Sequence, residues 1–447
     1  MNNNHITLPK VLIVGQSFNY SSGGGVTISH LFTNWKKSNL FSIHSGKENI
    51  SFDICNNVYV LGYKERTHSI FRPFVRQKNK GYIVRGTNAI GKNDFVVPIS
   101  KPYSKYSDIR MLLQRIGTYC GANHLFHHFQ ISKQLKKWLL EIAPDVIYAQ
   151  YADYASMRFV LELHNILKIP LIVHIMDDWI SIPPRTTVQD TVKENFLTRL
   201  FWKNRTNVLF NKLLCRASKR LVISEAMALE YHKRYNLKFS WAHNYVEEDK
   251  WSIYKKKTQQ KSDKIIIGYF GTIDIKNQDT FDDLLKALHE AKNYNIIVHI
   301  YSSCSLPEYF SNNDYIRLFN AVDQNVYKEE VLKCHILFLP LGFSDLSFKY
   351  TKLSIPTKLA EYLISEVPVL VYARPDTALY KFCFKNNCAI TVCEKSNGKL
   401  KDAIADIIEN KKQTEQIIQN AYHTAATLLS KKEMLIRFQN EFLNLKE

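Results

Sequence analysis

The chain alternates short apolar, β-rich runs with longer amphipathic stretches along most of its 447 residues. A parallel strand needs a crossover before the next strand can pair with it, so this alternation is typical of βα units on parallel sheets. The runs that we expect to be strands fall into two sets, 11–14, 146–149, 171–175 and 221–223, and then 265–269, 296–301, 336–340 and 367–372. We therefore predict an α/β protein with two parallel sheets.

A polar, basic segment separates the two sets of strands. It covers residues 248–263 and contains three consecutive lysines, Lys255 to Lys257. Such a segment is a natural domain boundary, and we divide the chain into residues 1–250 and 251–432, with the last residues treated separately below. Ligands of open parallel sheets bind beyond the carboxyl ends of the strands, so we expect the functional site between the two domains.

The charge balance indicates an anionic partner. Sixty basic and 41 acidic residues leave a formal net charge of +19, which favours nucleotides, nucleic acid or acidic lipid, or else serves only solubility. No recognition helix, RNA-binding motif or zinc motif accompanies the charge, so nucleic acid is the weaker candidate. No apolar run approaches the roughly 20 residues that span a bilayer, and no secretion leader is visible, so we expect a cytoplasmic protein.

Residues 354–363, Ser-Ile-Pro-Thr-Lys-Leu-Ala-Glu-Tyr-Leu, combine helix-start signals with two charged side chains. We expect Ser354 to cap a helix and Pro356 to lie in its first turn, which leaves backbone N–H groups free for an anion. Lys358 and Glu361 are three residues apart and share a helix face. A cation for phosphate beside a carboxylate that accepts two ribose hydroxyl protons suits a nucleoside diphosphate.

This segment resembles the nucleotide-binding signature of glycosyltransferase family 4 and its relatives, in which a Pro-Thr-Lys-x-x-Glu-Tyr helix holds a nucleotide-sugar donor. The resemblance implies the GT-B fold, two Rossmann-like domains whose parallel sheets face a cleft. It also implies that Glu361 binds the ribose, that Lys358 binds the diphosphate, and that Pro356 and Thr357 line the donor site. Many members carry a second glutamate where this chain has Leu353, so contacts to the donor sugar must come from elsewhere.

The same resemblance implies an activity and an arrangement of domains. Residues 1–250 would form the acceptor-side domain, with a final helix at about 433–447 packing back on it, and residues 251–432 would bind the donor. The implied reaction is a retaining transfer to a glycan or lipid-linked acceptor, in polysaccharide or glycolipid synthesis, without cofactor or metal. The alternatives are a sugar-nucleotide epimerase or hydrolase of the same fold, and a catalytically weak nucleotide-sugar-binding subunit.

A second segment, Ile-Ile-Ile-Gly-Tyr-Phe-Gly-Thr at residues 265–272, resembles the opening of the family's second domain. There a strand ends in Gly-x-x-Gly and a basic residue reaches the diphosphate. The resemblance makes Gly271 and Thr272 donor-binding residues and Lys276 the matching catalytic cation. Because the arginine found near Thr272 in many relatives is absent, a simple tight turn is the alternative.

Three consecutive glycines follow the first predicted strand. We expect a loop at residues 15–25 and then a helix over 26–35, with Gly24 and Gly25 presenting bare N–H groups to phosphate or sugar. The family has a Gly-Gly loop in the same place. A loop without function is the alternative.

Two aspartates end the predicted strand at 171–175. The sequence resembles the family's His-Asp-x-Trp strand end, with Met176 where the family has histidine, and His174 lies two residues earlier on the same face. The resemblance makes His174 and Asp177 catalytic candidates and Asp178 a candidate for sugar or acceptor hydroxyls. The alternatives are a hydrogen-bonded core histidine and, with less weight, a metal held by the paired aspartates.

The segment from Phe196 to Arg220 has seven basic residues and no acidic one, together with several apolar residues. Such a basic amphipathic helix suits an anionic membrane surface, which would make the protein peripheral on the inner face of the cytoplasmic membrane. The alternative is a helix that packs its apolar stripe on the first domain, and both hold if only the basic face meets lipid.

Overall fold

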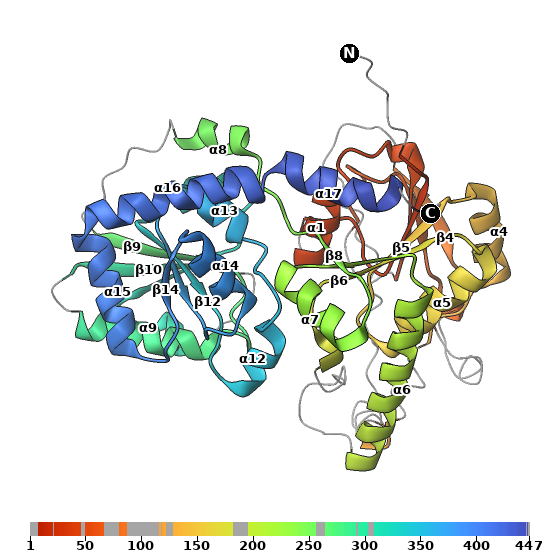
Figure 1. Ribbon diagram of the computed structural model, residues 1–447, viewed down its shortest axis with the longest axis horizontal. Helices are drawn as coiled ribbons and strands as arrows, with labels where there is room; N and C mark the ends of the chain where they lie inside the picture. Colours follow the sequence, from red (N-terminus) through yellow and green to blue (C-terminus); the bar gives the residue numbers. More distant parts are fainter. Residues whose placement is uncertain are drawn as a thin grey trace, which may run out of the picture. The chain divides into compact units, whose positions relative to one another are not determined.

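The computed structural model describes residues 8–20, 22–45, 50–66, 80–86, 116–117, 119–121, 128–181, 195–255, 264–291, 294–302, 308–443 and 445. The chain divides into two compact units (Figure 1). The first comprises Met1–Ala242 with Arg437–Glu447, and the second comprises His243–Ile436. Among the described residues, no helix is long and apolar enough to cross a membrane.

The described residues of the first unit form an eight-stranded sheet. In spatial order the strands are β4 (Tyr82–Arg85), β3 (Asn57–Val60), β2 (Leu40–His44), β1 (Val11–Val14), β5 (Val146–Ala149), β6 (Leu171–Ile175), β7 (Lys219–Val222) and β8 (Ser240–Trp241). Neighbouring strands are parallel except β4, which runs antiparallel to β3. From β1 the chain builds the sheet outward in one direction to β4 and then in the other from β5 to β8, as in doubly wound sheets.

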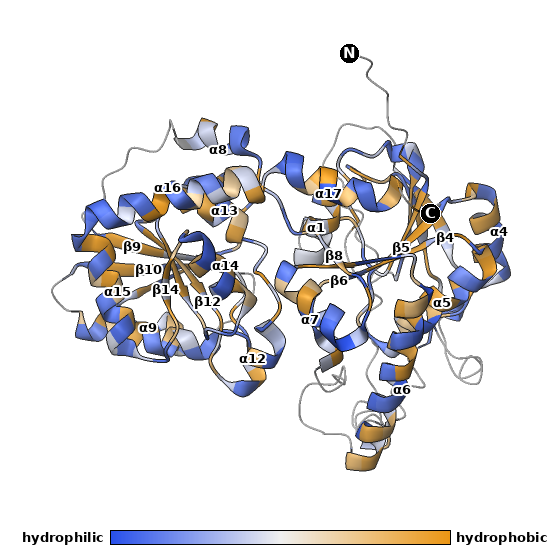
Figure 2. Cartoon of the chain, viewed as in Figure 1, coloured by the Kyte–Doolittle hydropathy of each residue, from blue (hydrophilic) through white to orange (hydrophobic). Residues whose placement is uncertain are grey.

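Helices cover both faces of this sheet, and its central strands are therefore buried on both sides. Every residue of β1, β5 and β6 is buried, the continuous apolar pattern of parallel strands between helices (Figure 2). The longer helices are α1 (Gly23–Leu31), α4 (Lys133–Ile142), α5 (Tyr154–Leu167), α6 (Phe196–Arg216) and α7 (Glu225–Tyr235).

The end of the chain packs on the first unit through aromatic rings. The last helix, α17 (Lys431–Leu443), carries the buried side chains Phe438 and Phe442. The Phe438 ring lies 5.1 Å from the ring of Phe32, and the Phe442 ring lies 5.0 Å from that of Trp35, centroid to centroid. Edge-on aromatic contacts of this kind add to the apolar burial, so the last helix is part of the first unit's core.

The second unit contains a six-stranded parallel sheet among its described residues. In spatial order the strands are β11 (Ile316–Asn320), β10 (Ile296–Ser302), β9 (Ile265–Phe270), β12 (Ile336–Pro340), β13 (Val369–Tyr372) and β14 (Ile390–Val392). One core cluster on the sheet contains Leu359, Tyr362 and Leu363, and another contains Phe281 and Phe338. The helices are α8 (Glu248–Lys255), α9 (Gln278–Glu290), α10 (Glu308–Ser311), α11 (Gln324–Leu332), α12 (Asp345–Thr351), α13 (Leu359–Ile364), α14 (Ala378–Asn386), α15 (Asn397–Glu409) and α16 (Lys411–Leu428).

The predicted α/β class with two parallel sheets is confirmed, and each of the eight predicted runs overlaps a strand. Two local predictions are wrong. The glycines at residues 23–25 form the first turn of α1 rather than a loop, because Ser22 caps the helix by accepting a hydrogen bond from the Gly25 N–H at 3.1 Å. Ser354 is not a helix cap, because α13 begins only at Leu359 and Lys358 occupies the cap position without a side-chain capping bond.

Candidate functional site

Lys358 lies where α13 meets the end of β9. Its amino group donates a hydrogen bond to the carbonyl oxygen of Phe270, the last residue of β9. Its nitrogen also lies 5.7 Å from the centroid of the Tyr327 ring. Burial lowers the pKa of Lys358 to about 8, although the nearby Glu361 opposes that change. The amino group is therefore a largely desolvated cation that can gain or lose its proton near neutral pH.

Glu361 lies in the first turn of α13, three residues after Lys358. Burial raises the pKa of its carboxyl group, and Lys358, the Tyr327 hydroxyl and Lys328 oppose that rise. Glu361 and Lys358 form no direct ion pair, so each remains available to a ligand while its charge favours the charged form of the other.

Two residues of α11 complete this cluster, and the sequence gives no motif that marks them. Tyr327 is buried and its hydroxyl finds no hydrogen-bond partner of good geometry among the described residues. Lys328 is buried too, with its amino group 5.2 Å from the centroid of the Tyr254 ring, and burial lowers its pKa. A second desolvated lysine therefore lies close enough to Glu361 for its charge to lower the pKa of that carboxyl group.

Gly271 lies beside Lys358. The Gly271 N–H donates to the carbonyl of Tyr301 at 2.9 Å, and a β-carbon added to Gly271 would stand 3.6 Å from the Lys358 nitrogen. Thr272 is exposed, and its carbonyl accepts a hydrogen bond from the Tyr269 hydroxyl at 2.7 Å. The structure therefore brings the Gly-x-x-Gly strand end and the Lys358 side chain together.

Lys276 belongs to the turn between β9 and α9. Its N–H donates to the Asp274 carboxylate at 2.8 Å, and its carbonyl accepts from the Gly342 N–H and the Ser347 hydroxyl, each at 2.6 Å. These bonds anchor the backbone to the loop after β12. The side chain is partly exposed and makes no ion pair with any described residue. The backbone of Lys276 is held in place, and its partly exposed amino group is accessible to an anionic ligand.

Pro356 and Thr357 form the turn that leads into α13. The Leu359 N–H donates to the Pro356 carbonyl at 3.0 Å, and both turn residues are partly exposed. Leu353, at the position where a glutamate was expected by resemblance, is buried at 5% exposure. It offers no polar group to a sugar.

Gly24 and Gly25 lie at the amino end of α1 in the first unit. A β-carbon on Gly25 would stand 2.4 Å from the Asn19 side chain, and one on Gly24 would stand 2.8 Å from Gln16. Asn19 in turn accepts hydrogen bonds from the N–H and the hydroxyl of Ser22. The glycines thus have a packing reason to lack side chains, whatever else their backbone binds.

His174 has no exposed surface in the centre of the first sheet. Its Nδ1 lies 2.6 Å from the Tyr148 hydroxyl, which also accepts a hydrogen bond from Gln150. Burial lowers the pKa of His174 to about 3, so the imidazole is neutral. In this conformation His174 can act on a ligand only through its neighbours.

Asp177 and Asp178, after β6, occupy different environments. Asp177 is exposed, whereas Asp178 is buried and accepts hydrogen bonds from the Tyr231 hydroxyl at 2.7 Å and from Arg234 at 2.9 and 3.1 Å. Both carboxylate oxygens of Asp178 are thus engaged by the protein. No group of three potential ligands that could hold a metal ion occurs among the described residues.

Comparison of the chain with known proteins identifies its fold. No family model matches the chain, and no curated protein does. Solved structures match over nearly the whole length, among them sucrose-phosphate synthase from Thermosynechococcus elongatus, at 10% identity and a TM-score of 0.61, covering 98% of each chain. The chain has the GT-B fold.

Two further GT-B structures show the same similarity. HepE from Anabaena in complex with UDP-glucose matches at 12% identity and a TM-score of 0.58, covering 97% of this chain and 98% of HepE. WaaG, a glycosyltransferase involved in lipopolysaccharide biosynthesis, matches at 12% identity and a TM-score of 0.52, covering 95% of this chain and 99% of WaaG. At these identities the matches establish the GT-B fold alone.

The contacts of Asp178 predict that it supports the structure. Replacing Asp178 with asparagine leaves the Arg234 guanidinium without its buried carboxylate, and we expect the free energy of unfolding to fall by about 1 to 3 kcal/mol. Urea unfolding of the first unit, followed by circular dichroism, measures this change.

The matched control is Glu230→Gln, which removes the more exposed partner of the same arginine. It should cost about 0.5 kcal/mol or less. An Asp178→Asn protein as stable as the wild type would contradict the structural role. Asp178 would then again be a candidate for contacts to sugar or acceptor hydroxyls.

Proposed function

We propose that this chain is a glycosyltransferase that moves a hexosyl unit from a nucleotide-sugar donor to a glycan or lipid-linked acceptor. The observation that carries the proposal is the partly desolvated pair of Lys358, at the cap position of α13 beside the end of β9, and Glu361, in the first turn of α13. The GT-B fold supports it, since HepE, a structure of similar fold, was solved with UDP-glucose.

The pair suits the two ends of a nucleoside diphosphate. A partly buried carboxylate can accept hydrogen bonds from two ribose hydroxyls in a fixed geometry, and a partly buried ammonium gains from a nearby phosphate. Lys358 donates a hydrogen bond to the Phe270 carbonyl, and donor binding would redirect its amino group to the diphosphate. Pro356 and Thr357, in the turn before α13, would line the same donor site.

The rest of the second unit would supply further contacts. Gly271 and Thr272 follow β9, with Gly271 beside Lys358, and Lys276 comes next on an anchored turn as a second cation for the diphosphate. Positive charge aimed at the leaving group stabilises the transition state more than the ground state, because charge develops there as the glycosidic bond breaks. We propose retention, with the leaving phosphate accepting the acceptor's proton.

From the first unit we propose the backbone of Gly24 and Gly25 as a contact to the donor, and Asp177 as the exposed carboxylate that meets the acceptor. His174 would act indirectly, through its hydrogen bond with the Tyr148 hydroxyl. Asp178 would hold the loop after β6 in place through its ion pair with Arg234. The chain would act in the cytoplasm, at the inner face of the cytoplasmic membrane when the acceptor is lipid-linked, in polysaccharide or glycolipid synthesis.

One observation favours a second candidate, a nucleotide-sugar-binding subunit with little transfer activity. Leu353 is buried and apolar where a carboxylate would hold the sugar. Such a subunit would bind donors without consuming them, whereas a hydrolase of this fold would release nucleoside diphosphate equally fast with or without acceptor.

A donor screen tests the proposal. The protein is incubated with UDP-, GDP-, ADP- and dTDP-sugars, with and without lipid-linked acceptors, while nucleoside diphosphate release and calorimetric affinity are measured. We expect one nucleotide to bind and its release to depend on acceptor. Glu361→Ala should weaken binding about a hundredfold, because two hydrogen bonds to a charged group are worth about 3 kcal/mol or more together.

Glu415→Ala is the matched control, since Glu415 is an exposed glutamate on α16 of the same unit. It should bind like the wild type. Absence of binding to every donor would remove the enzyme proposal, and unchanged affinity of Glu361→Ala would remove the ribose assignment.

The lowered pKa of Lys358 predicts a pH dependence of donor binding. The lysine is charged below its pKa of about 8 and neutral above it, and only the charged form attracts a diphosphate. Affinity for the nucleotide found in the screen should therefore be constant near pH 7. It should fall by up to about tenfold per pH unit as the pH rises through 8.

Calorimetry between pH 7 and 9.5 measures this profile. Lys358→Arg keeps its charge throughout the range, so its affinity should vary much less with pH. A flat wild-type profile, or the same slope in both proteins, would rule out Lys358 as the titrating phosphate contact.

A further inference from the structure

Helix α6 carries two sets of apolar residues, and only one of them is buried. Trp202, Thr206, Phe210, Leu213 and Leu214 are buried within the first unit. The residues Phe196, Leu197, Leu200, Phe201 and Val208 are each more than half exposed. A helix whose only task is to pack on a domain needs one apolar stripe, so the second one requires its own explanation.

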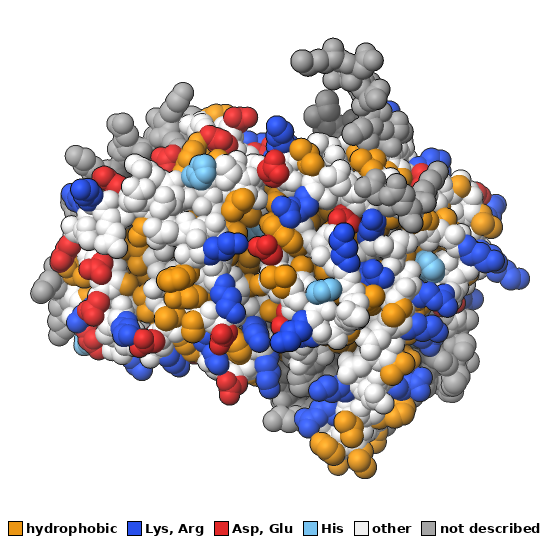
Figure 3. Space-filling model, in the orientation of Figure 1, with side chains coloured by type: hydrophobic (Ala, Val, Ile, Leu, Met, Phe, Trp, Pro, Cys, Tyr) orange, Lys and Arg blue, Asp and Glu red, His pale blue; other side chains and the backbone are white. Residues whose placement is uncertain are grey.

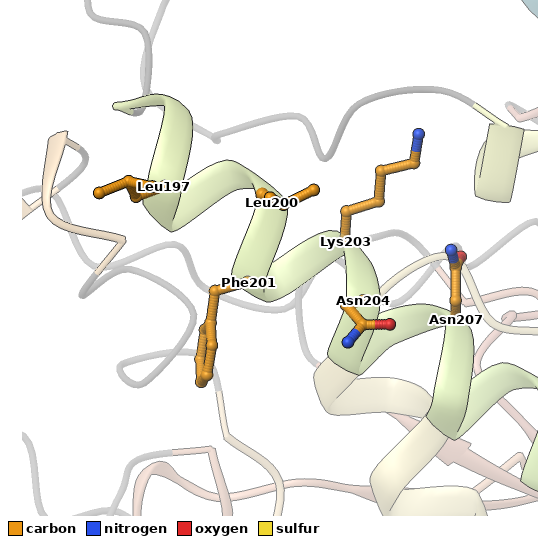
Figure 4. Close-up of a pocket in the computed structure, with 6 residues that line it drawn as sticks. All are labelled: Leu197, Leu200, Phe201, Lys203, Asn204 and Asn207. Carbon is orange, nitrogen blue, oxygen red and sulfur yellow. The ribbon is translucent and has the colours of Figure 1, made fainter.

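Most of the exposed apolar residues lie in the first two turns of the helix. We call Phe196, Leu197, Leu200 and Phe201 the α6 tip. Part of it lines a shallow hollow of about 520 Å³, which continues along the helix to Lys203, Asn204 and Asn207 (Figure 4). The surface therefore changes from apolar at the helix start to polar and basic further along.

The polar end leads into a second hollow of about 360 Å³ that shares Asn207. Its described lining is mixed and combines Ser181, Asn211 and Arg234 with Ile180, Phe210 and Tyr235. On α6 itself the first hollow passes from the leucines and phenylalanine of the tip to Lys203, Asn204 and Asn207. This is the order that a bilayer presents from its acyl chains outward to its headgroups.

The charged residues of α6 itself are all basic. The seven basic residues from Phe196 to Arg220 are accompanied by no acidic one. The Arg199 guanidinium lies 5.9 Å from the Phe196 ring centroid, and that of Arg205 lies 5.5 Å from the Phe201 ring centroid. Figure 3 shows hydrophobic side chains gathered at this end of α6 with Lys and Arg beside them. The amino end of the helix dipole adds positive potential at the same place.

We infer that the α6 tip docks on an anionic lipid bilayer, with its apolar side chains entering the boundary between headgroups and acyl chains and Arg199 and Lys203 binding lipid phosphates. Apolar burial and attraction to anionic lipid contribute together in such contacts. The inference rests on the membrane location in the proposed function and names the surface that makes the contact, which itself requires neither donor nor acceptor.

A second copy of this chain is a poorer occupant. In a symmetric dimer the same patch appears on both sides, so an α6 tip facing another α6 tip would bring two strongly basic helices together without any acidic partner on them. An anionic bilayer, in contrast, complements the cations and accepts the apolar residues.

Vesicle sedimentation tests the inference. The full chain is mixed with vesicles of phosphatidylcholine alone, or with about 30% phosphatidylglycerol, and the bound fraction is measured against lipid concentration. We expect binding to the anionic vesicles that weakens as salt is raised, and little binding to the neutral ones. Leu197→Ser/Phe201→Ser should lower the partition coefficient about tenfold or more, because the apolar contribution is lost.

The control is Leu229→Ser/Phe384→Ser, which removes one exposed leucine and one exposed phenylalanine from other helices. Arg199→Gln/Lys203→Gln is compared with Lys133→Gln/Lys136→Gln, which removes two exposed charges from α4. Each α6 variant should bind several-fold less than its control. All the replaced residues are at the surface, so folding should be unaffected, and circular dichroism verifies this.

Three results would overturn the inference. They are absence of wild-type binding to anionic vesicles, equal binding by the α6 variants and their controls, and a change of oligomeric state in light scattering that accounts for the difference. Calorimetric donor binding in the absence of vesicles is measured on the same proteins. Loss of vesicle binding with intact donor binding would therefore separate failure of the docking surface from failure of the proposed function.

Discussion

The hydrogen bond from Lys358 to the Phe270 carbonyl joins the start of α13 to the end of β9. Charge buried in a protein interior is costly unless it is paired, and here the nearby carboxylate of Glu361 makes no direct ion pair with the lysine. The cost appears in the pKa values, lowered for Lys358 and raised for Glu361. A ligand with a diphosphate at one end and vicinal hydroxyls at the other would satisfy both groups at once.

The surrounding fold keeps these groups in place. Leu359, Tyr362 and Leu363 are wholly buried on one face of α13, and the Tyr362 hydroxyl accepts a hydrogen bond from the Phe270 N–H at 3.1 Å. Phe270 therefore contacts α13 through both its N–H and its carbonyl. Holding a site on a packed helix and a central strand limits its movement, which favours binding through preorganised contacts.

The sequence predicts the parts of the fold that follow a simple period. Central parallel strands are continuous apolar runs, and all eight predicted runs overlap strands. Strands with a mixed pattern escaped prediction. Buried β2 contains Ser42 and His44, β4 alternates as an antiparallel edge, and most of edge strand β11 is exposed. Such strands form because they pair with strands that are distant in the sequence. A local sequence pattern carries no information about that pairing.

The candidate site also contains residues that the sequence predicts and residues that it does not. Lys358 and Glu361 follow from helix spacing and a motif, and the structure brings Gly271 next to Lys358. Tyr327 and Lys328 could not be found, because only tertiary packing places α11 against Glu361. Ser354 was misassigned because α13 begins only at Leu359, and the glycines at 23–25 were misassigned because Ser22 caps a helix that begins at Gly23.

A crystal structure of the chain with a bound nucleotide sugar tests the central claim most directly. The account predicts that the Lys358 amino group leaves the Phe270 carbonyl and contacts a diphosphate oxygen. Both ribose hydroxyls should lie within hydrogen-bond distance of the Glu361 carboxylate. A nucleotide bound elsewhere, with the bond from Lys358 to Phe270 unchanged, would contradict it.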